Sequence, residues 1–179
     1  NGDRTVKENT SISTALADED WDYISYQQVS QNSGQYNTFT TPLPALHNYV
    51  KVRAKNPEVK YVLHQTWAYA QNSTHAGFAN YNNNQQTMYE AIVSTYKQAK
   101  TLINADIVVP AGTAIQNGRA SLLGDNFTRD GFHLDFNIGR YTASCAWFET
   151  IFGQNVVGNS FKPSGLGDLQ TEIAQHAAH

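Results

Sequence analysis

Hydrophobic and polar residues alternate along the chain in blocks that predict three buried strands separated by helices. Short runs of apolar, β-branched and aromatic residues lie at 22–27, 61–66 and 106–110, each bounded by polar or turn-forming residues. The segments between them repeat apolar residues at the spacing of an amphipathic helix. Because strands that alternate with helices form parallel sheets covered on both faces, the pattern predicts an α/β fold.

Helices are predicted over 13–20, from Pro42 or Pro44 to Asn56, over 85–103, over 138–152, and from about Asp168. Residues 70–84 form a long polar loop, which in a compact domain is usually functional or disordered. In three of the helices, the residues that recur at helical spacing are Leu46, Tyr49, Val50 and Arg53; Met88, Ile92, Tyr96, Ala99 and Ile103; and Ile138, Tyr141, Cys145, Phe148 and Phe152.

The chain fits a single domain, in which residues 153–179 form a Gly/Pro-containing linker and a terminal helix. Three strands are few for this fold class, since typical sheets have about 5–6. We therefore expect further strand units, with the start of the chain as their natural place. The chain opens Asn1-Gly-Asp-Arg without Met, which indicates processing or excision from a longer protein.

Composition narrows the function classes. The net charge is −3 and no basic run occurs, which argues against a nucleic-acid surface. No apolar run approaches the roughly 20 residues of a membrane span. The lone Cys145 excludes an internal disulfide and a multi-cysteine metal site, and its apolar helical setting favours a small core residue.

The first candidate site is the segment from Asp130 to His133. A carboxylate that holds one ring nitrogen of a histidine frees the other to act as general base. Gly131 allows the tight turn that would present both side chains to one pocket. The alternative is a surface loop in which Asp130 caps a turn and His133 is idle. The position of this loop beyond the third strand favours the dyad, because ligands bind at the carboxyl ends of parallel strands.

Other polar and aromatic side chains are expected at the same edge of the sheet. Gln27 and Gln28 end the first strand and could donate to an oxyanion, or could be plain strand-end polar residues. Trp67 and Tyr69 follow the second strand and could frame a hydroxyl-rich ligand, although a Trp at this place is about as often structural. Arg119 could bind an anionic ligand or pair with a nearby acid.

Other chemistries have less support. No HExxH motif occurs and the histidines are scattered, so no metal site is predicted. A glycosidase could use Asp130 and Asp135, but Asp130 is better explained as the partner of His133. Neither a phosphate loop nor a dinucleotide fingerprint is present, so we expect no nucleotide and no other cofactor.

With these residues in view, the chain resembles the SGNH (GDSL-type) hydrolases, in particular the bacterial branch catalogued as DUF4886. The most specific match is Arg129-Asp-Gly-Phe-His-Leu-Asp135 with Gly139-Arg-Tyr141. The other matching stretches are Asp20–Ser30, His64–Tyr69 and Val109–Asn117, and together they cover nearly the whole chain in order. The resemblance implies a flavodoxin-like three-layer α/β/α fold and a Ser-His-Asp mechanism, with His133 and Asp130 in the DxxH positions.

The chain departs from this family pattern in two places. Where many relatives have an oxyanion-hole Asn, this chain has Gln27 and Gln28, of which Gln28 is slightly favoured. The nucleophile block, which in the family precedes the stretch that begins at Asp20, is absent from that position. Gly158-Asn159-Ser160-Phe161 spells a related block but follows the Asp/His motif, so Ser160 is a weak alternative. We therefore expect the nucleophile, with its strand units, outside this sequence.

The resemblance, together with the candidate residues, predicts a serine esterase of the SGNH type, and specifically a carbohydrate acetyl esterase. The expected partners are a small-molecule or polysaccharide ester and an N-terminal fragment of the same protein, without nucleic acid or membrane span. Secretion or a periplasmic location follows from the resemblance alone. The alternative is a non-catalytic glycan-binding module, in which the same crevice binds sugar without turnover.

Overall fold

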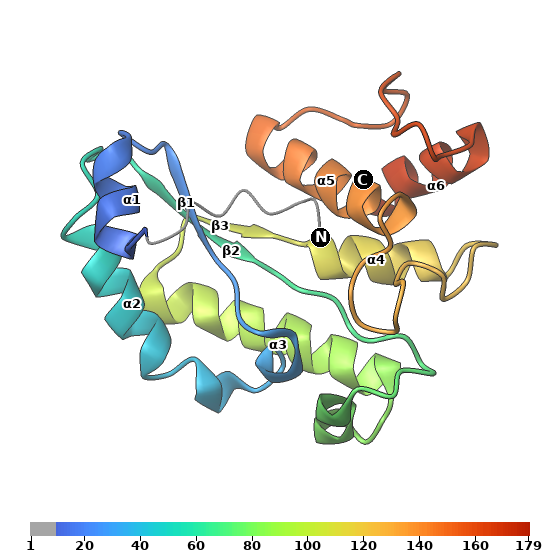
Figure 1. The fold of residues 1–179 in the computed structure, drawn as a ribbon, viewed down its shortest axis with the longest axis horizontal. Coiled ribbons are helices and arrows are strands. Elements are labelled where there is room, and N and C mark those ends of the chain that lie inside the picture. Colours follow the sequence, from blue (N-terminus) through green and yellow to red (C-terminus); the bar gives the residue numbers. More distant parts are fainter. Residues whose placement is uncertain (1–9) are drawn as a thin grey trace.

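A three-stranded parallel sheet lies between two layers of helices (Figure 1). The structure is a computed structural model and describes residues 10–179. The strands are β1 (Tyr23–Tyr26), β2 (Lys60–His64) and β3 (Ile107–Val109), in the order β1-β2-β3. Tyr23 is in register with Lys60, and Val62 with Ile107. The α/β class and the parallel sheet predicted from the sequence are thus confirmed.

Within residues 10–179, one α-helix precedes the first strand and five others connect or follow the strands. They are α1 (Ile12–Asp18), α2 (Pro42–Lys51), α3 (Gln85–Ile103), α4 (Ala111–Arg119), α5 (Ile138–Phe152) and α6 (Asp168–Ala178). Short 3₁₀ helices occupy Ser30–Asn32, Tyr36–Thr38 and Ala76–Tyr81. Two of the α-helices begin at side-chain caps, where Ser11 accepts from Thr14 N and Asn84 from Thr87 N.

The alternation of side chains along each strand builds one core on each face of the sheet. In β2, Leu63 packs with α1, α2 and α3, whereas the next residue back, Val62, packs with α4, α5 and α6. Both side chains are almost fully buried. The face of α3 predicted from the sequence, from Met88 to Ile103, is buried in the first of these cores. The three layers that the sequence predicts are therefore present.

Two helix faces differ from the sequence prediction. In α2 the buried residues are Leu43, His47 and Val50, while Leu46 and Tyr49 are 37% and 39% exposed, so the face that packs on the core is turned from the predicted one and shares only Val50 with it. In α5, Phe152 is 65% exposed, because the helix ends there, beyond the part that packs on the core.

Cys145 on α5 is 2% exposed, and burial raises the pKa of its thiol to about 11. It is a small core residue, as the sequence indicated. Among residues 10–179, no helix combines the length and the apolar character needed to cross a bilayer.

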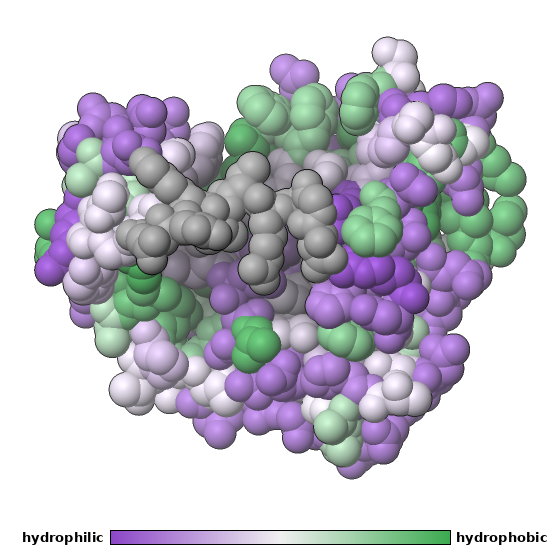
Figure 2. All heavy atoms as spheres, in the orientation of Figure 1, coloured by the Kyte–Doolittle hydropathy of each residue, from purple (hydrophilic) through white to green (hydrophobic). Residues whose placement is uncertain are grey.

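The two helical layers do not cover the sheet equally. In the space-filling view, polar side chains cover most of the surface, with scattered apolar ones among them (Figure 2). Helix α5 packs on β3, and the exposed residues Tyr23 and Ser25 of β1 lie beyond its cover. Among residues 10–179, the first strand thus has the least cover from helices.

The start of α4 approaches the end of β2 so closely that only glycine fits. A Cβ at Gly112 would lie 1.8 Å from the carbonyl oxygen of Thr66, and Gly112 N donates to Gln65 O at 3.1 Å. We expect Gly112→Ala to lower the free energy of unfolding by about 1–3 kcal/mol, measured by urea denaturation. Gly167→Ala is the matched control, since its Cβ would meet only Gln170 Oε1 at 3.8 Å. Equal stability of the two variants would contradict the tight approach.

Candidate active site

Asp130 and His133 form a hydrogen-bonded pair at the carboxyl end of the sheet. His133 Nδ1 lies 2.6 Å from Asp130 Oδ2. The other carboxylate oxygen, Oδ1, accepts from His133 N at 2.7 Å and from Phe132 N at 3.1 Å. Within residues 10–179 the remaining ring nitrogen of His133, Nε2, has no hydrogen-bond partner. The pair therefore has the arrangement of a general base and the carboxylate that orients it.

The charge of Asp130 is stabilised by these contacts. Partial burial alone would raise the pKa of the Asp130 carboxyl. The hydrogen bonds from the His133 ring and from the backbone of His133 and Phe132 outweigh this effect and hold the pKa below its usual value. The carboxylate is thus ionised at neutral pH and fixes Nδ1 of His133 as a proton donor.

The loop that presents the pair is closed by its own backbone. Thr128 and Leu134 form an antiparallel bridge, and Arg129 N donates to His133 O at 2.9 Å. The guanidinium of Arg129 donates to Leu134 O at 3.0 Å. These bonds join the two ends of the loop, so that the short Asp130–His133 turn projects from a fixed base.

The segment after β2 holds this turn from the other side. Ala70 N donates to Gly131 O at 2.8 Å, and Trp67 Nε1 donates to Phe132 O at 2.7 Å. Gly131 has φ +88°, and a Cβ there would lie 3.1 Å from Ser73 Cα. A side chain at this position would be strained and crowded, which confirms the need for glycine in this turn.

Aromatic rings pack beneath the pair. The ring centroid of Phe132 lies 4.1 Å from that of His133 and 4.7 Å from that of His75. Tyr69 contacts both His75 and Phe132, is fully buried, and is hydrogen-bonded through its hydroxyl to Ser30 Oγ at 2.9 Å. Tyr69 therefore supports the dyad from below, and its ring has no face open to a ligand.

Arg119 is also an internal group. Its side chain is 4% exposed, and its Nε lies 2.8 Å from Asp125 Oδ1, while Nη2 donates to Ala68 O at 3.0 Å. The second oxygen of Asp125 accepts from Gln71 N and Gln85 Nε2. The Arg119 guanidinium is buried and Asp125 is 32% exposed, and together they hold the segment 68–71 that contacts the dyad loop.

His133 opens onto a cavity of about 510 Å³ between its loop, the end of β2 and α5. The wall includes Trp67, which the sequence singled out, and also residues that it did not. The full lining is His64, Trp67, Arg129, His133, Leu134, Arg140, Ala143, Ser144 and Trp147. Position at the end of β2 was the signal that could have pointed to His64.

His64 and Trp147 join β2 to α5 inside this cavity. Trp147 Nε1 donates to His64 Nδ1 at 2.8 Å, and the two rings stack with their centroids 5.5 Å apart. Burial lowers the pKa of His64 to about 4. His64 is therefore neutral at physiological pH, as an acceptor for the indole requires.

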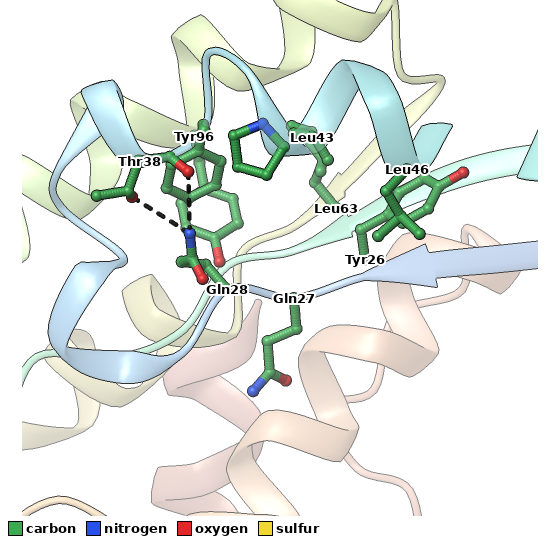
Figure 3. Close-up of a pocket in the computed structure, with 10 residues that line it drawn as sticks. Tyr26, Gln27, Gln28, Thr38, Leu43, Leu46, Leu63 and Tyr96 are labelled. Atoms are coloured by element: carbon green, nitrogen blue, oxygen red, sulfur yellow. Dashed lines mark hydrogen bonds between the residues drawn. The ribbon is translucent and has the colours of Figure 1, made fainter. Parts of the chain in front are cut away.

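The two glutamines at the end of β1 point to opposite sides (Figure 3). Gln28 lines a separate cavity of about 110 Å³ next to α2 and α3, where its amide donates to Thr38 and accepts from Val29 N. Gln27 also borders that cavity, but its exposed side chain turns away from Gln28, toward the other helical layer (Figure 3). Of the two amides only that of Gln27 turns toward this layer, and neither glutamine lines the cavity beside His133.

One protein family matches the sequence over its whole length. The model of the DUF4886 family, a domain of unknown function, matches residues 1–179. The chain belongs to the DUF4886 family. No curated protein matches it.

Two solved structures resemble this DUF4886 chain. A DUF4886 family protein from Bacteroides uniformis is 49% identical with a TM-score of 0.92, and the match covers 94% of this chain and 65% of that one. The chain thus spans less than two thirds of that protein. A proposed SGNH hydrolase from Slackia heliotrinireducens is 22% identical with a TM-score of 0.56, covering 76% of this chain and 68% of that one. This second likeness shows the SGNH hydrolase fold.

The remaining candidates of the DUF4886 chain lie apart from the dyad. Ser160 is exposed between Asn159, whose carbonyl accepts from Gln175, and Phe161, whose carbonyl accepts from Tyr141. This places it against α5 and α6, outside the lining of the dyad cavity. Asp135 caps α5 by accepting from Asn137 N and Ile138 N. Among residues 10–179, no group of three or more His, Cys, Asp or Glu could hold a metal.

The buried His64 predicts a pH-dependent stability. Its folded pKa of about 4 lies below the ordinary 6.5, so below pH 6.5 protons bind the unfolded chain first. We expect stability to fall from about pH 6.5 to pH 4, with His64 contributing up to about 3 kcal/mol. His64→Gln should flatten the curve by this amount in urea denaturation at several pH values. His176→Gln, an exposed position on α6, is the control, and an unchanged slope in His64→Gln would contradict the assignment.

Proposed function

We propose that this protein is an ester hydrolase of the SGNH type that uses a Ser-His-Asp mechanism. The observation that supports it is the 2.6 Å contact between Asp130 and His133 at the mouth of a cavity, on an SGNH hydrolase fold. The serine would be supplied from outside the 179 residues. Secretion or a periplasmic location remains part of this proposal.

In the proposed reaction, His133 Nε2 takes the proton of the serine hydroxyl as the oxygen attacks the ester carbonyl. Asp130 keeps Nδ1 protonated and stabilises the imidazolium that forms. The same proton then passes from His133 to the departing alkoxide, which leaves an acyl-enzyme. His133 then takes a proton from a water molecule as its oxygen attacks the acyl carbon, and returns that proton to the serine oxygen as the acyl–serine bond breaks and the acid leaves. Gln27 is the side-chain donor that we assign to the oxyanion.

The cavity favours a carbohydrate ester as substrate. Trp67 and Trp147 supply aromatic surface, and Arg129 and Ser144 supply polar groups in the same wall. Such a mixture suits a hydroxyl-rich ligand that is bound by stacking and hydrogen bonds. We propose a small acyl group, such as acetyl, on a sugar.

The alternative function is glycan binding without turnover. It is favoured by one observation, that no serine of residues 10–179 is hydrogen-bonded to His133. In that case, sugar binding would survive the loss of His133, whereas an esterase would lose its activity.

For the esterase, we expect His133→Ala in the full-length gene product to lower kcat/KM on 4-nitrophenyl acetate and acetylated sugars by at least about 10³-fold. Asp130→Asn should have a similar effect, because it removes the acceptor that fixes the tautomer of His133. His176→Ala is the matched control and should keep full activity. Full activity in His133→Ala would exclude the mechanism.

For the 179-residue chain alone, we expect no rapid reaction with a fluorophosphonate, because the described cavity holds no activated serine. The measurement is intact mass after labelling. Rapid labelling that disappears in Ser160→Ala, or in Ser144→Ala, would instead identify that serine as the nucleophile and contradict the proposal that it lies outside this sequence.

A further inference from the structure

One wall of the dyad cavity is aromatic and consists of His64, Trp67 and Trp147. Each indole has a single N–H and no other polar group. The N–H of Trp67 donates to Phe132 O at 2.7 Å, and that of Trp147 donates to His64 Nδ1 at 2.8 Å. Because both N–H groups are used inside the protein, the two tryptophans can offer a ligand only the surface of their rings.

The indole of Trp147 determines the tautomer of His64. Because an indole nitrogen can only donate, Nδ1 of His64 has to be the acceptor and carries no proton. Burial lowers the pKa of His64 to about 4, so the ring is neutral at pH 7. The single N–H of this neutral ring is therefore on Nε2, the nitrogen that the indole N–H does not approach.

The Nε2–H of His64 has no acceptor within residues 10–179, and these residues do not enclose it fully. His64 is half-buried and lines the same cavity as His133. Its ring contacts both tryptophans, edge-on to Trp67 with the centroids 6.2 Å apart and stacked on Trp147. The aromatic wall thus combines two indole rings with one N–H that the described part of the chain does not use.

The other uncharged polar side chains of this cavity can accept a hydrogen bond from a ligand but have no donor left. Ser144 donates its hydroxyl hydrogen to Arg140 O at 2.8 Å, and His133 donates its Nδ1–H to Asp130. What remains to them is the lone pairs of the Ser144 oxygen and Nε2 of His133, which are acceptors. Among the uncharged side chains that line the cavity in the described range, His64 is therefore the one with an unused donor.

We propose that His64 is a substrate-binding residue whose Nε2–H donates to a hydroxyl or ring oxygen of the sugar that carries the ester. A sugar ring has C–H faces that pack on indole rings and oxygens that accept hydrogen bonds, so it matches both parts of the aromatic wall. The inference rests on the proposed carbohydrate substrate and adds the side chain that would recognise the sugar. The ester carbonyl is the other uncharged acceptor in such a substrate, and the kinetic test separates the two.

The variant His64→Asn separates the two hydrogen bonds of His64. Asn can still accept from the Trp147 indole, but it is too short to place a donor at the position of Nε2. The substrates are O-acetylated glucose, xylose or galactose, whichever the wild-type full-length gene product hydrolyses fastest, and 4-nitrophenyl acetate, which contains no sugar. We expect KM for the acetylated sugar to rise about three- to tenfold with kcat changed less than about twofold, as for the loss of one neutral hydrogen bond.

The comparison of the two substrates decides where His64 acts. The loss of kcat/KM in His64→Asn should be at least about threefold greater for the acetylated sugar than for 4-nitrophenyl acetate. Equal losses would mean that His64 acts on the ester carbonyl or on folding, and unchanged kinetics would mean that it contacts no substrate. Either result overturns the inference. His176→Asn, the same substitution at an exposed position on α6, is the matched control and should leave both reactions unchanged.

A measurement on the unaltered 179-residue chain covers the case that His64→Asn fails to fold. Long-range ¹⁵N–¹H NMR spectra distinguish protonated from unprotonated ring nitrogens, and we expect His64 to carry its proton on Nε2. At least one of glucose, xylose and galactose should shift the Nε2 signal. A proton on Nδ1, or no shift with any of the three sugars, would overturn the inference. Sugar binding at His64 without hydrolysis of any ester would support it and remove the proposed esterase, whereas hydrolysis without such binding would do the reverse.

Discussion

Two backbone carbonyls in adjacent residues determine the geometry of the candidate site. The oxygens of Gly131 and Phe132 accept from Ala70 N and from the indole of Trp67, and these bonds tie the dyad loop to the end of β2. Without them, this short loop beyond the last strand could adopt many conformations. Fixing it in the one that pairs Asp130 with His133 would then cost conformational entropy. The pairing of Asp130 and His133 thus depends on where β2 ends.

The clamp itself is held by buried polar groups. Arg119 and Asp125 fix residues 68–71, and Gln65 accepts from the backbone and hydroxyl of Thr113 at the start of α4. Loss of Asp125 would leave the buried Arg119 charge without its partner, so the clearest effect of the pair is to select one conformation. Through this network, residues 65–71 are tied to α4 and to Asp125 and support the dyad loop.

The sequence predicted the order of elements well because each has a local signal. The periodicity of α3 and the apolar run of β2 depend on neighbours in the chain. Helix α4 escaped prediction, since Gly112, Thr113, Asn117 and Gly118 are weak helix formers and Gly112 is required by contact with Thr66. Within the site, Asp130 and His133 are three residues apart and their pairing could be inferred from spacing and turn chemistry.

Long-range partners could not be inferred in this way. Tyr69 is buried, and its hydroxyl is hydrogen-bonded to Ser30, a residue 39 positions away. The directions of the Gln27 and Gln28 side chains likewise depend on how the end of β1 lies between the two helical layers. The partner of Arg119 was left open between a ligand and an acid, and the fold decides for Asp125. Such outcomes follow from tertiary packing, which periodicity does not encode.

The buried Cys145 has a practical consequence. The chain contains a single thiol, which is almost inaccessible and whose raised pKa keeps it in the unreactive protonated form. The native protein therefore resists thiol reagents and intermolecular disulfide formation without any substitution. A cysteine introduced at the surface would be modified selectively, so fluorescent or spin labels can be attached at a single chosen site on the natural background.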